Sequence, residues 1–251
     1  MCGFLGLISK NIYLYENKCS KALNYIKHRG PDDRSISKST WYWAGFQRLS
    51  IIDLTDKGRQ PMRYQHFQII FNGEIYNAND LRNILKKIGY KFLSKSDTEV
   101  ALKSYVEWGV DCFQKFNGMW SIAIFDEKNK NVSLYRDHLG IKPLYYTFSK
   151  DHKYFLFGSE IKSFKPFFKF EENKNSLQEH FLYNSILNDK TFIKNINIVL
   201  PNQCLKFELE TCKISSYFIN KNFQNSNTFK NENMVEYFEK LIIDAVRLRL
   251  V

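Results

Sequence analysis

The first eight residues, Met1-Cys2-Gly3-Phe4-Leu5-Gly6-Leu7-Ile8, form an apolar run that predicts a short buried strand with a cysteine at its start. Removal of Met1 makes Cys2 the N-terminal residue and leaves a thiol and a free α-amine on one backbone unit. Because an α-amine titrates at a pH of about 8, part of it is unprotonated at neutral pH and able to accept the thiol proton. For this run alone, an unreactive buried cysteine is the better interpretation. Other segments of the sequence must therefore decide whether Cys2 is a nucleophile.

The composition is that of an ordinary globular protein. Of the 251 residues, 44% are hydrophobic and 25% are charged, which is enough to bury a core. The five cysteines are odd in number and show no CxxC spacing, so we expect neither a zinc ribbon nor a disulfide framework. No stretch approaches the ~18 apolar residues that span a bilayer, and the N-terminal run lacks a basic flank. We therefore expect a cytoplasmic protein without a membrane partner.

The charge and histidine patterns exclude two further classes of partner. The formal net charge is +11, but the lysines are scattered among Asn, Ile and Phe and form no basic block. No helix-turn-helix, RNP or zinc-finger pattern occurs, so no nucleic acid is expected as a partner. The five histidines lack HxH or HxxxH spacing, so no metal site is expected.

Hydrophobic periodicity predicts many strands and a few helices. Strands are expected at residues 3–8, 67–71, 119–126, 132–136, 143–148, 154–158, 203–208 and 213–218. Helices are expected at 79–88 with Leu81, Ile84, Leu85 and Ile88 on one face, from Asp97 to Gly109, after Ser159 and around 177–183. The runs 119–126 and 132–136 flank a polar turn and predict a hairpin of core strands. This mixture indicates an α+β protein built in layers.

The C-terminal part divides into a polar segment and an amphipathic helix. Residues 220–233 carry six Asn and neither Gly nor Pro, which is typical of a linker. From Met234 to the end of the chain, apolar residues recur at helical spacing. We therefore expect one domain over residues 2–219, a polar linker over 220–233, and a helix over 234–251 that begins a further domain.

A series of motifs, in this order, resembles the class II glutamine amidotransferase domain of glutamine-hydrolysing asparagine synthetases. They are Met1–Gly6, His28–Asp33, Gln47–Leu54, Gln60–Met62, Phe71–Asn77, Ser96–Glu99, Asn117–Trp120, Arg136–Tyr146 and Ser159–Lys162. Several motifs in one order are more specific than any single pattern. The resemblance implies the fold of the N-terminal-nucleophile (Ntn) hydrolases, a four-layer αββα sandwich of two antiparallel sheets flanked by helices.

The resemblance also assigns roles. Cys2 is the implied nucleophile with its α-amine as the base, and Asn72 and Gly73 form the oxyanion hole. Arg48 holds the α-carboxylate of glutamine, Glu74 and Asp97 hold its α-ammonium, and Leu49, Ser50, Ile51 and Ile52 shape the pocket. Glutamine is a zwitterion, so its selection requires one cation and one or two anions. No residue is implied as a metal ligand.

Each of these groups, taken alone, has a simpler interpretation. Asn72-Gly73 after an apolar strand is typical of a type I′ hairpin turn. Ser96–Glu99 is typical of a helix N-cap with acids in the first turn. Arg48 alone is a surface cation. Their occurrence together with Cys2 favours the glutaminase interpretation.

The function implied is hydrolysis of L-glutamine to glutamate and ammonia, for the ATP-dependent amidation of aspartate. Alternatives are an amidotransferase subunit or fragment for a sugar or another carboxylate in surface-polysaccharide synthesis, and a non-catalytic remnant. The phosphate-binding Ser-Gly-Gly-x-Asp-Ser loop of the family does not occur before Val251. We therefore expect no cofactor in this chain, and ATP and Mg only in an absent synthetase domain. The expected partners are L-glutamine, a separate synthetase subunit and a second copy of the chain.

Overall fold

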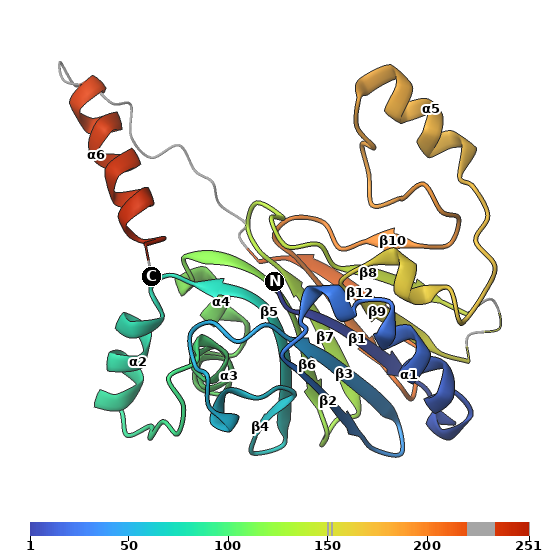
Figure 1. The fold of residues 1–251 in the computed structure, drawn as a ribbon, viewed down its shortest axis with the longest axis horizontal. Helices are drawn as coiled ribbons and strands as arrows, with labels where there is room; N and C mark the ends of the chain where they lie inside the picture. Colours follow the sequence, from blue (N-terminus) through green and yellow to red (C-terminus); the bar gives the residue numbers. More distant parts are fainter. Residues whose placement is uncertain (150, 152, 220–233, 251) are drawn as a thin grey trace.

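Two antiparallel sheets of six strands each pack face to face in the computed structural model, which describes residues 1–149, 151, 153–219 and 234–250 (Figure 1). The first sheet contains β1 (Gly3–Ile8), β2 (Asp33–Lys38), β3 (Tyr42–Arg48), β8 (Tyr145–Phe148), β9 (Phe155–Gly158) and β10 (Asn197–Ile198). The second contains β4 (Met62–Tyr64), β5 (Phe67–Ile75), β6 (Gly118–Asp126), β7 (Asn131–Arg136), β11 (Gln203–Glu208) and β12 (Lys213–Phe218). Their strand orders are β10-β8-β9-β1-β3-β2 and β12-β11-β7-β6-β5-β4.

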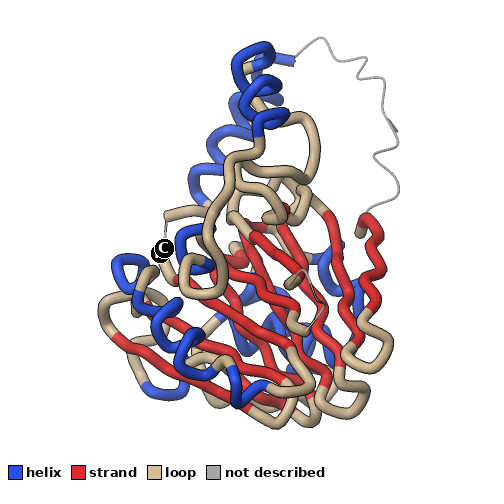
Figure 2. Tube along the Cα trace, turned by 90° about the vertical axis from the view of Figure 1, so that its right-hand side faces the viewer, coloured by secondary structure: helices blue, strands red, loops and turns tan. Residues whose placement is uncertain are grey.

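Helices cover the outer faces of both sheets. Helix α1 (Glu16–Asn24) packs on the first sheet, and α2 (Ala78–Lys87), α3 (Asp97–Trp108) and α4 (Cys112–Lys115) pack on the second. The strands occupy the middle of the molecule, and these helices lie outside them (Figure 2). Helices α5 (Lys174–Tyr183) and α6 (Met234–Arg247) project from the layered body (Figure 1). The predicted four-layer αββα sandwich is confirmed.

Side chains on both faces of the strands are buried, which explains the continuous apolar runs. On β1, Phe4 and Ile8 face the cluster between the two sheets, whereas Leu5 and Leu7 face the cluster under α1. On β5, Ile70 belongs to the cluster between the sheets, and its neighbour Phe71 belongs to the one under α3. The period-two alternation of a strand therefore places consecutive side chains of β1 and β5 in different layers of the core.

Most predicted elements are present. The predicted strands at 3–8, 203–208 and 213–218 match β1, β11 and β12, and the core hairpin is β6 and β7. Helices α2, α3 and α5 are confirmed; Leu81 and Leu85 of α2 are buried, whereas Ile84 and Ile88 are exposed. The helix after Ser159 is a short 3₁₀ helix, Ile161–Phe164. The helix predicted from Met234 is α6, and the linker predicted at 220–233 lies outside the described residues.

The turn interpretation of Asn72-Gly73 is wrong. Strand β5 continues to Ile75, and its register pairs Asn72 with Ser121 and Gly73 with Trp120 of β6. A Cβ atom on residue 73 would lie 2.1 Å from the Met119 carbonyl oxygen. Glycine is required here by the close approach of two strands and not by a turn.

The loop after β7 is held by one buried carboxylate. The side chain of Asp137, which is fully buried, accepts hydrogen bonds from four backbone N–H groups. These donors belong to Trp120 at 3.2 Å, Leu139 at 3.1 Å, Ile141 at 2.9 Å and Lys142 at 2.9 Å. The loop therefore ends with Lys142 in a fixed position, where this residue lines the cavity described below.

We expect Asp137→Ala to lower the free energy of unfolding by ~3 kcal/mol, because buried N–H donors lose a charged acceptor. Asp137→Asn keeps one acceptor oxygen and should lose less. Urea unfolding measures both, with Glu210→Ala, a substitution of an exposed acid, as the control. A loss below about 1 kcal/mol in Asp137→Ala would show that water or other groups satisfy these donors.

Candidate active site

A cavity of about 160 Å³ lies where β1, β3 and β5 approach one another, and it gathers most of the residues singled out in the sequence. Those that line it are Cys2, Arg48, Leu49, Ile51, Ile52, Asn72, Gly73, Glu74 and Asp97. Ser50 is not among the lining residues; its N–H donates to the Asp32 carboxylate at 2.8 Å. Segments separated by up to 95 positions in the sequence therefore meet at one site.

The position of Cys2 follows from strand register. Gly3 pairs with Gln47 on β3, so Cys2 lies opposite Arg48 and next to Leu49. The Leu49 N–H donates to Cys2 Sγ at 3.4 Å, and Arg29 Nε donates to the Cys2 carbonyl oxygen at 2.8 Å. Burial raises the pKa of the Cys2 thiol, and the bond from Leu49 offsets this only in part. The thiol is therefore protonated at neutral pH and needs a base to become a nucleophile.

The second sheet presents a free backbone donor to the cavity. In an antiparallel strand, alternate residues direct both N–H and C=O to the same side. On β5, the Phe71 N–H bonds to Gln60 Oε1 at 2.6 Å and the Ile75 N–H to Asp97 Oδ2 at 3.1 Å, both on the edge away from β6. The Gly73 N–H points to the same edge between them and has no partner among the described residues.

The Asn72 side chain adds a second donor. It points to the face of β5 that carries Ile70, toward the first sheet, where Cys2 lies. Asn72 is 2% exposed, and its Nδ2 atom is buried without a hydrogen-bond partner in the described part of the chain. A buried unsatisfied donor is costly. Its position beside the free Gly73 N–H makes a site that can stabilise a negatively charged oxygen.

One cation and two acids complete the lining. The Arg48 guanidinium is held by carbonyl oxygens, Thr55 O at 3.1 Å and Asp53 O, with no carboxylate bonded to it in the described residues. Asp97 is the first residue of α3, after the Ser96 N-cap. Burial, together with the nearby charge of Glu74, raises the pKa of Asp97 to about 7, against the lowering effect of the hydrogen bond from the Ile75 N–H. The cavity thus offers positive charge at Arg48 and negative charge at Glu74 and Asp97.

The cavity also contains polar residues that sequence analysis did not single out. Asp53, Gln60, Thr98 and Lys142 line it, and each lies in or next to a quoted motif. Lys142 is 6% exposed, and burial together with Arg29 lowers its pKa. The sequence carried no local signal for these roles, because the burial of Asp53 and Lys142 in the cavity results from contacts between distant segments.

The described residues hold no cluster of three or more His, Cys, Asp or Glu side chains that would suit a metal ion. In the same part of the chain, no helix is both long and apolar enough to cross a bilayer.

This arrangement, a cysteine at the start of a central strand and donors without a partner in the described residues on the opposite sheet, is set in the αββα fold of the Ntn hydrolases. Its fold is similar to glutamine phosphoribosylpyrophosphate amidotransferase from B. subtilis, with a TM-score of 0.63 at 16% identity over 88% of this chain and 50% of that one. A structure described as the allosteric regulatory enzyme of purine biosynthesis gives a TM-score of 0.64 at 16% identity, with the same coverage. The chain belongs to the family described as Glutamine amidotransferase domain, which it matches over residues 1–218.

Curated relatives carry the name expected from the motifs. A putative asparagine synthetase [glutamine-hydrolyzing] 2 of Methanocaldococcus jannaschii is 34% identical over 100% of this chain and 52% of that protein. Asparagine synthetase [glutamine-hydrolyzing] 3 of Bacillus subtilis is 35% identical over 100% of this chain and 42% of that protein. The chain therefore spans about half or less of the length of these relatives. The resemblance to the amidotransferase domain of asparagine synthetases is confirmed.

The raised pKa of Asp97 predicts a pH-dependent cost to folding. Because this pKa is higher in the folded than in the unfolded chain, stability is favoured at low pH and is lost as the pH rises through about 7. The Asp97→Asn side chain does not titrate, so the variant does not lose stability in this way. Its amide oxygen can still accept the hydrogen bond from the Ile75 N–H. We expect its stability relative to wild type to rise by about 2–3 kcal/mol from pH 5 to pH 8.

Urea unfolding at the two pH values measures this difference. Asp80→Asn, which removes an exposed acid of α2, is the matched control and should give a constant difference. A constant difference for Asp97→Asn as well would contradict the titration.

Proposed function

We propose that this chain is the glutaminase part of an asparagine synthetase-like enzyme and hydrolyses L-glutamine to glutamate and ammonia. The observation that carries the proposal is the Cys2 thiol in one cavity with two unpartnered donors, Asn72 Nδ2 and the Gly73 N–H. Acyl transfer requires a nucleophile and an oxyanion site together. Both are supplied here from facing sheets.

The chemistry begins with loss of Met1, which frees the Cys2 α-amine. The amine accepts the thiol proton while Sγ attacks the side-chain amide carbon of glutamine. The carbonyl oxygen becomes negatively charged, and Asn72 Nδ2 and the Gly73 N–H donate to it. The amine then returns the proton to the leaving nitrogen, ammonia departs and a thioester remains. Water attacks the thioester in the same way, which releases glutamate and restores the thiol.

The charged residues of the cavity suit the two ends of the substrate. Arg48, whose bonded oxygens in the described residues are all uncharged carbonyls, is available to pair with the α-carboxylate of glutamine. Asp97 and Glu74 are placed to bind the α-ammonium, and this cation would stabilise the ionised form of Asp97. A plain amide lacks both charges and would leave these groups unpaired, which is the basis of selectivity.

The ammonia has a proposed destination. The two relatives above are named glutamine-hydrolysing asparagine synthetases and are about twice as long as this chain or longer. We infer that a synthetase part uses the ammonia in the cytoplasm for ATP-dependent amidation of aspartate. ATP and Mg²⁺ belong to that part, because the polar groups of this cavity are assigned to glutamine. Pairing of two copies of the chain is a further expectation.

Cys2 should be the mature N-terminus and should react with a diazoketone that mimics glutamine. The thiol and the freed amine form a self-contained nucleophile. Intact-mass spectrometry should show the loss of Met1 and one adduct, which disappears in Cys2→Ala. Cys212→Ala, which alters the other half-buried cysteine, should keep the adduct. Glutamine hydrolysis by protein that retains Met1 would contradict the mechanism.

Arg48 and Asn72 should affect different kinetic constants. Arg48→Lys keeps the charge but loses the planar fork, so it should raise KM about tenfold and change kcat less than about threefold. Asn72→Ala should lower kcat by about 10²-fold, because its donor is used only when the oxyanion forms. Steady-state glutamate release measures both, with exposed Arg59→Lys and Asn79→Ala as controls. A normal kcat in Asn72→Ala would remove this residue from the oxyanion hole.

A further inference from the structure

The two charged ends of the cavity are carried by different layers of the fold. Arg48 is the last residue of β3 in the first sheet, and Asp97 begins α3 on the outside of the second sheet. Neither residue is hydrogen-bonded to the other within the described part of the chain. A substrate with two charged ends nevertheless requires a fixed spacing between them.

Asp53 is bonded to the Arg48 side of the cavity. Its backbone oxygen accepts from Arg48 Nη2, and its Oδ1 accepts from the Thr55 N–H at 2.9 Å and the Thr55 hydroxyl at 2.7 Å. The Thr55 carbonyl in turn accepts from Arg48 Nη1 at 3.1 Å. Gly58 packs closely against this loop: a Cβ atom on residue 58 would lie 2.8 Å from Arg48 Nη2. The hydrogen bonds between the Asp53 carboxylate and Thr55 thus stabilise the turn at residues 53–55, whose carbonyl oxygens accept from the Arg48 guanidinium.

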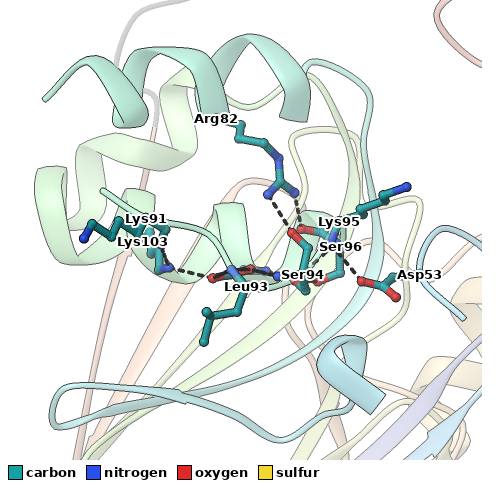
Figure 3. A network of polar contacts seen from close by, with 9 residues as sticks. Asp53, Arg82, Lys91, Leu93, Ser94, Lys95, Ser96 and Lys103 are labelled. Carbon is teal, nitrogen blue, oxygen red and sulfur yellow. Dashed lines mark hydrogen bonds and ion pairs between the residues drawn. The ribbon is translucent and has the colours of Figure 1, made fainter. Parts of the chain in front are cut away.

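The same carboxylate reaches the Asp97 side. Asp53 Oδ2 accepts from the Lys95 N–H at 2.8 Å, two residues before Asp97 (Figure 3). Arg82 holds this segment from another side, with its two terminal nitrogens donating to Ser94 O and Ser96 O at 2.8 Å each (Figure 3). Ser96 then caps α3 at Asp97. The segment before Asp97 is therefore fixed to α2 by Arg82 and to the Arg48 loop by Asp53.

Both carboxylate oxygens of Asp53 are occupied by these hydrogen bonds. Asp53 is 8% exposed, and its two carboxylate oxygens accept three hydrogen bonds from Thr55 and Lys95. Burial opposes its charge, but these bonds outweigh it and hold the pKa of Asp53 below its usual value. The carboxylate is ionised at neutral pH and supports both charged ends without being needed as a ligand itself.

We propose that Asp53 is a positioning residue that sets the spacing between Arg48 and Asp97, and so makes the cavity selective for an amide with both an α-carboxylate and an α-ammonium. This inference rests on the proposed glutaminase function. Without the link, both charges remain in the cavity but their spacing is no longer held. Glutamine affinity and selectivity then fall. Cys2, Asn72 and Gly73 still perform the reaction, because the hydrogen bonds of the Asp53 carboxylate in the described residues go to Thr55 and Lys95 and not to them.

The test is Asp53→Asn, with Asp56→Asn as the matched control. An amide has one acceptor oxygen, so it cannot satisfy the donors of Thr55 and Lys95 together. Asp56 lies three positions on, and its side chain is 84% exposed. The measurements are kcat and KM for glutamine and for 4-carbamoylbutanoate, which lacks the α-ammonium.

For Asp53→Asn we expect the glutamine KM to rise about tenfold and kcat to change less than about threefold. The preference for glutamine over 4-carbamoylbutanoate in kcat/KM should fall about tenfold. Asp56→Asn should match wild type within about twofold. An unchanged KM and an unchanged preference in Asp53→Asn would overturn the proposal.

Two further measurements separate this inference from the proposed function. Backbone hydrogen exchange needs no activity: in Asp53→Asn it should quicken in residues 49–56 and also in 91–96, and quickening confined to 49–56 would overturn the link. If Asp53→Asn does not fold, Lys95→Pro removes the same hydrogen bond from the donor side and should give the same rise in KM; a normal KM there would overturn the proposal. Absence of glutaminase activity and of a diazoketone adduct in wild type would instead refute the proposed function.

Discussion

The unpaired edge of β5 is the constraint from which the cavity follows. Strand β4 pairs with Phe67–Ile69, and beyond that point β5 has no strand neighbour on this side in the part of the chain that the structure describes. Each backbone N–H on the edge still requires an acceptor. Gln60 satisfies Phe71 and Asp97 satisfies Ile75, and both acceptors thereby become walls of the cavity. Gly73, between them, keeps its donor for a ligand, and the same strand turns Asn72 toward Cys2.

The charged and polar groups of this cavity are incompletely paired within the described residues of the free protein. Arg48 is surrounded by carbonyl oxygens, Asp97 is buried beside Glu74, and the Asn72 amide nitrogen has no partner in the described residues. Each of these arrangements lowers the free energy of unfolding when no substrate is bound. Active sites commonly carry such costs, and the extensive apolar layers under α1 and α3 provide the compensating stability.

Much of the fold was predictable, because strands buried on both faces leave continuous apolar runs. Strand β3 has Gly45 and Gln47 in a buried stretch, and β2 is polar except for Ile36, which is exposed. Both strands lack that signal and were not predicted. Asn72-Gly73 has a local pattern identical to that of a hairpin turn, and only its pairing with β6 decides otherwise. The roles of Asp53 and Lys142 depend on contacts made between distant segments, which no local pattern specifies. Ser50 was grouped with its neighbours but is not among the residues that line the cavity.

The start residue of the chain has a practical consequence. Met1 lines the cavity, and its sulfur lies 3.2 Å from Lys142 Nζ. In the proposed mechanism Met1 therefore has two effects: it fills part of the cavity that glutamine would occupy, and it blocks the α-amine of Cys2. Removal of this one residue would open the cavity and free the amine at the same time. By the same mechanism, a tag fused directly in front of Cys2 would block the proposed base, whereas a tag after residue 251 would leave the Cys2 amine free.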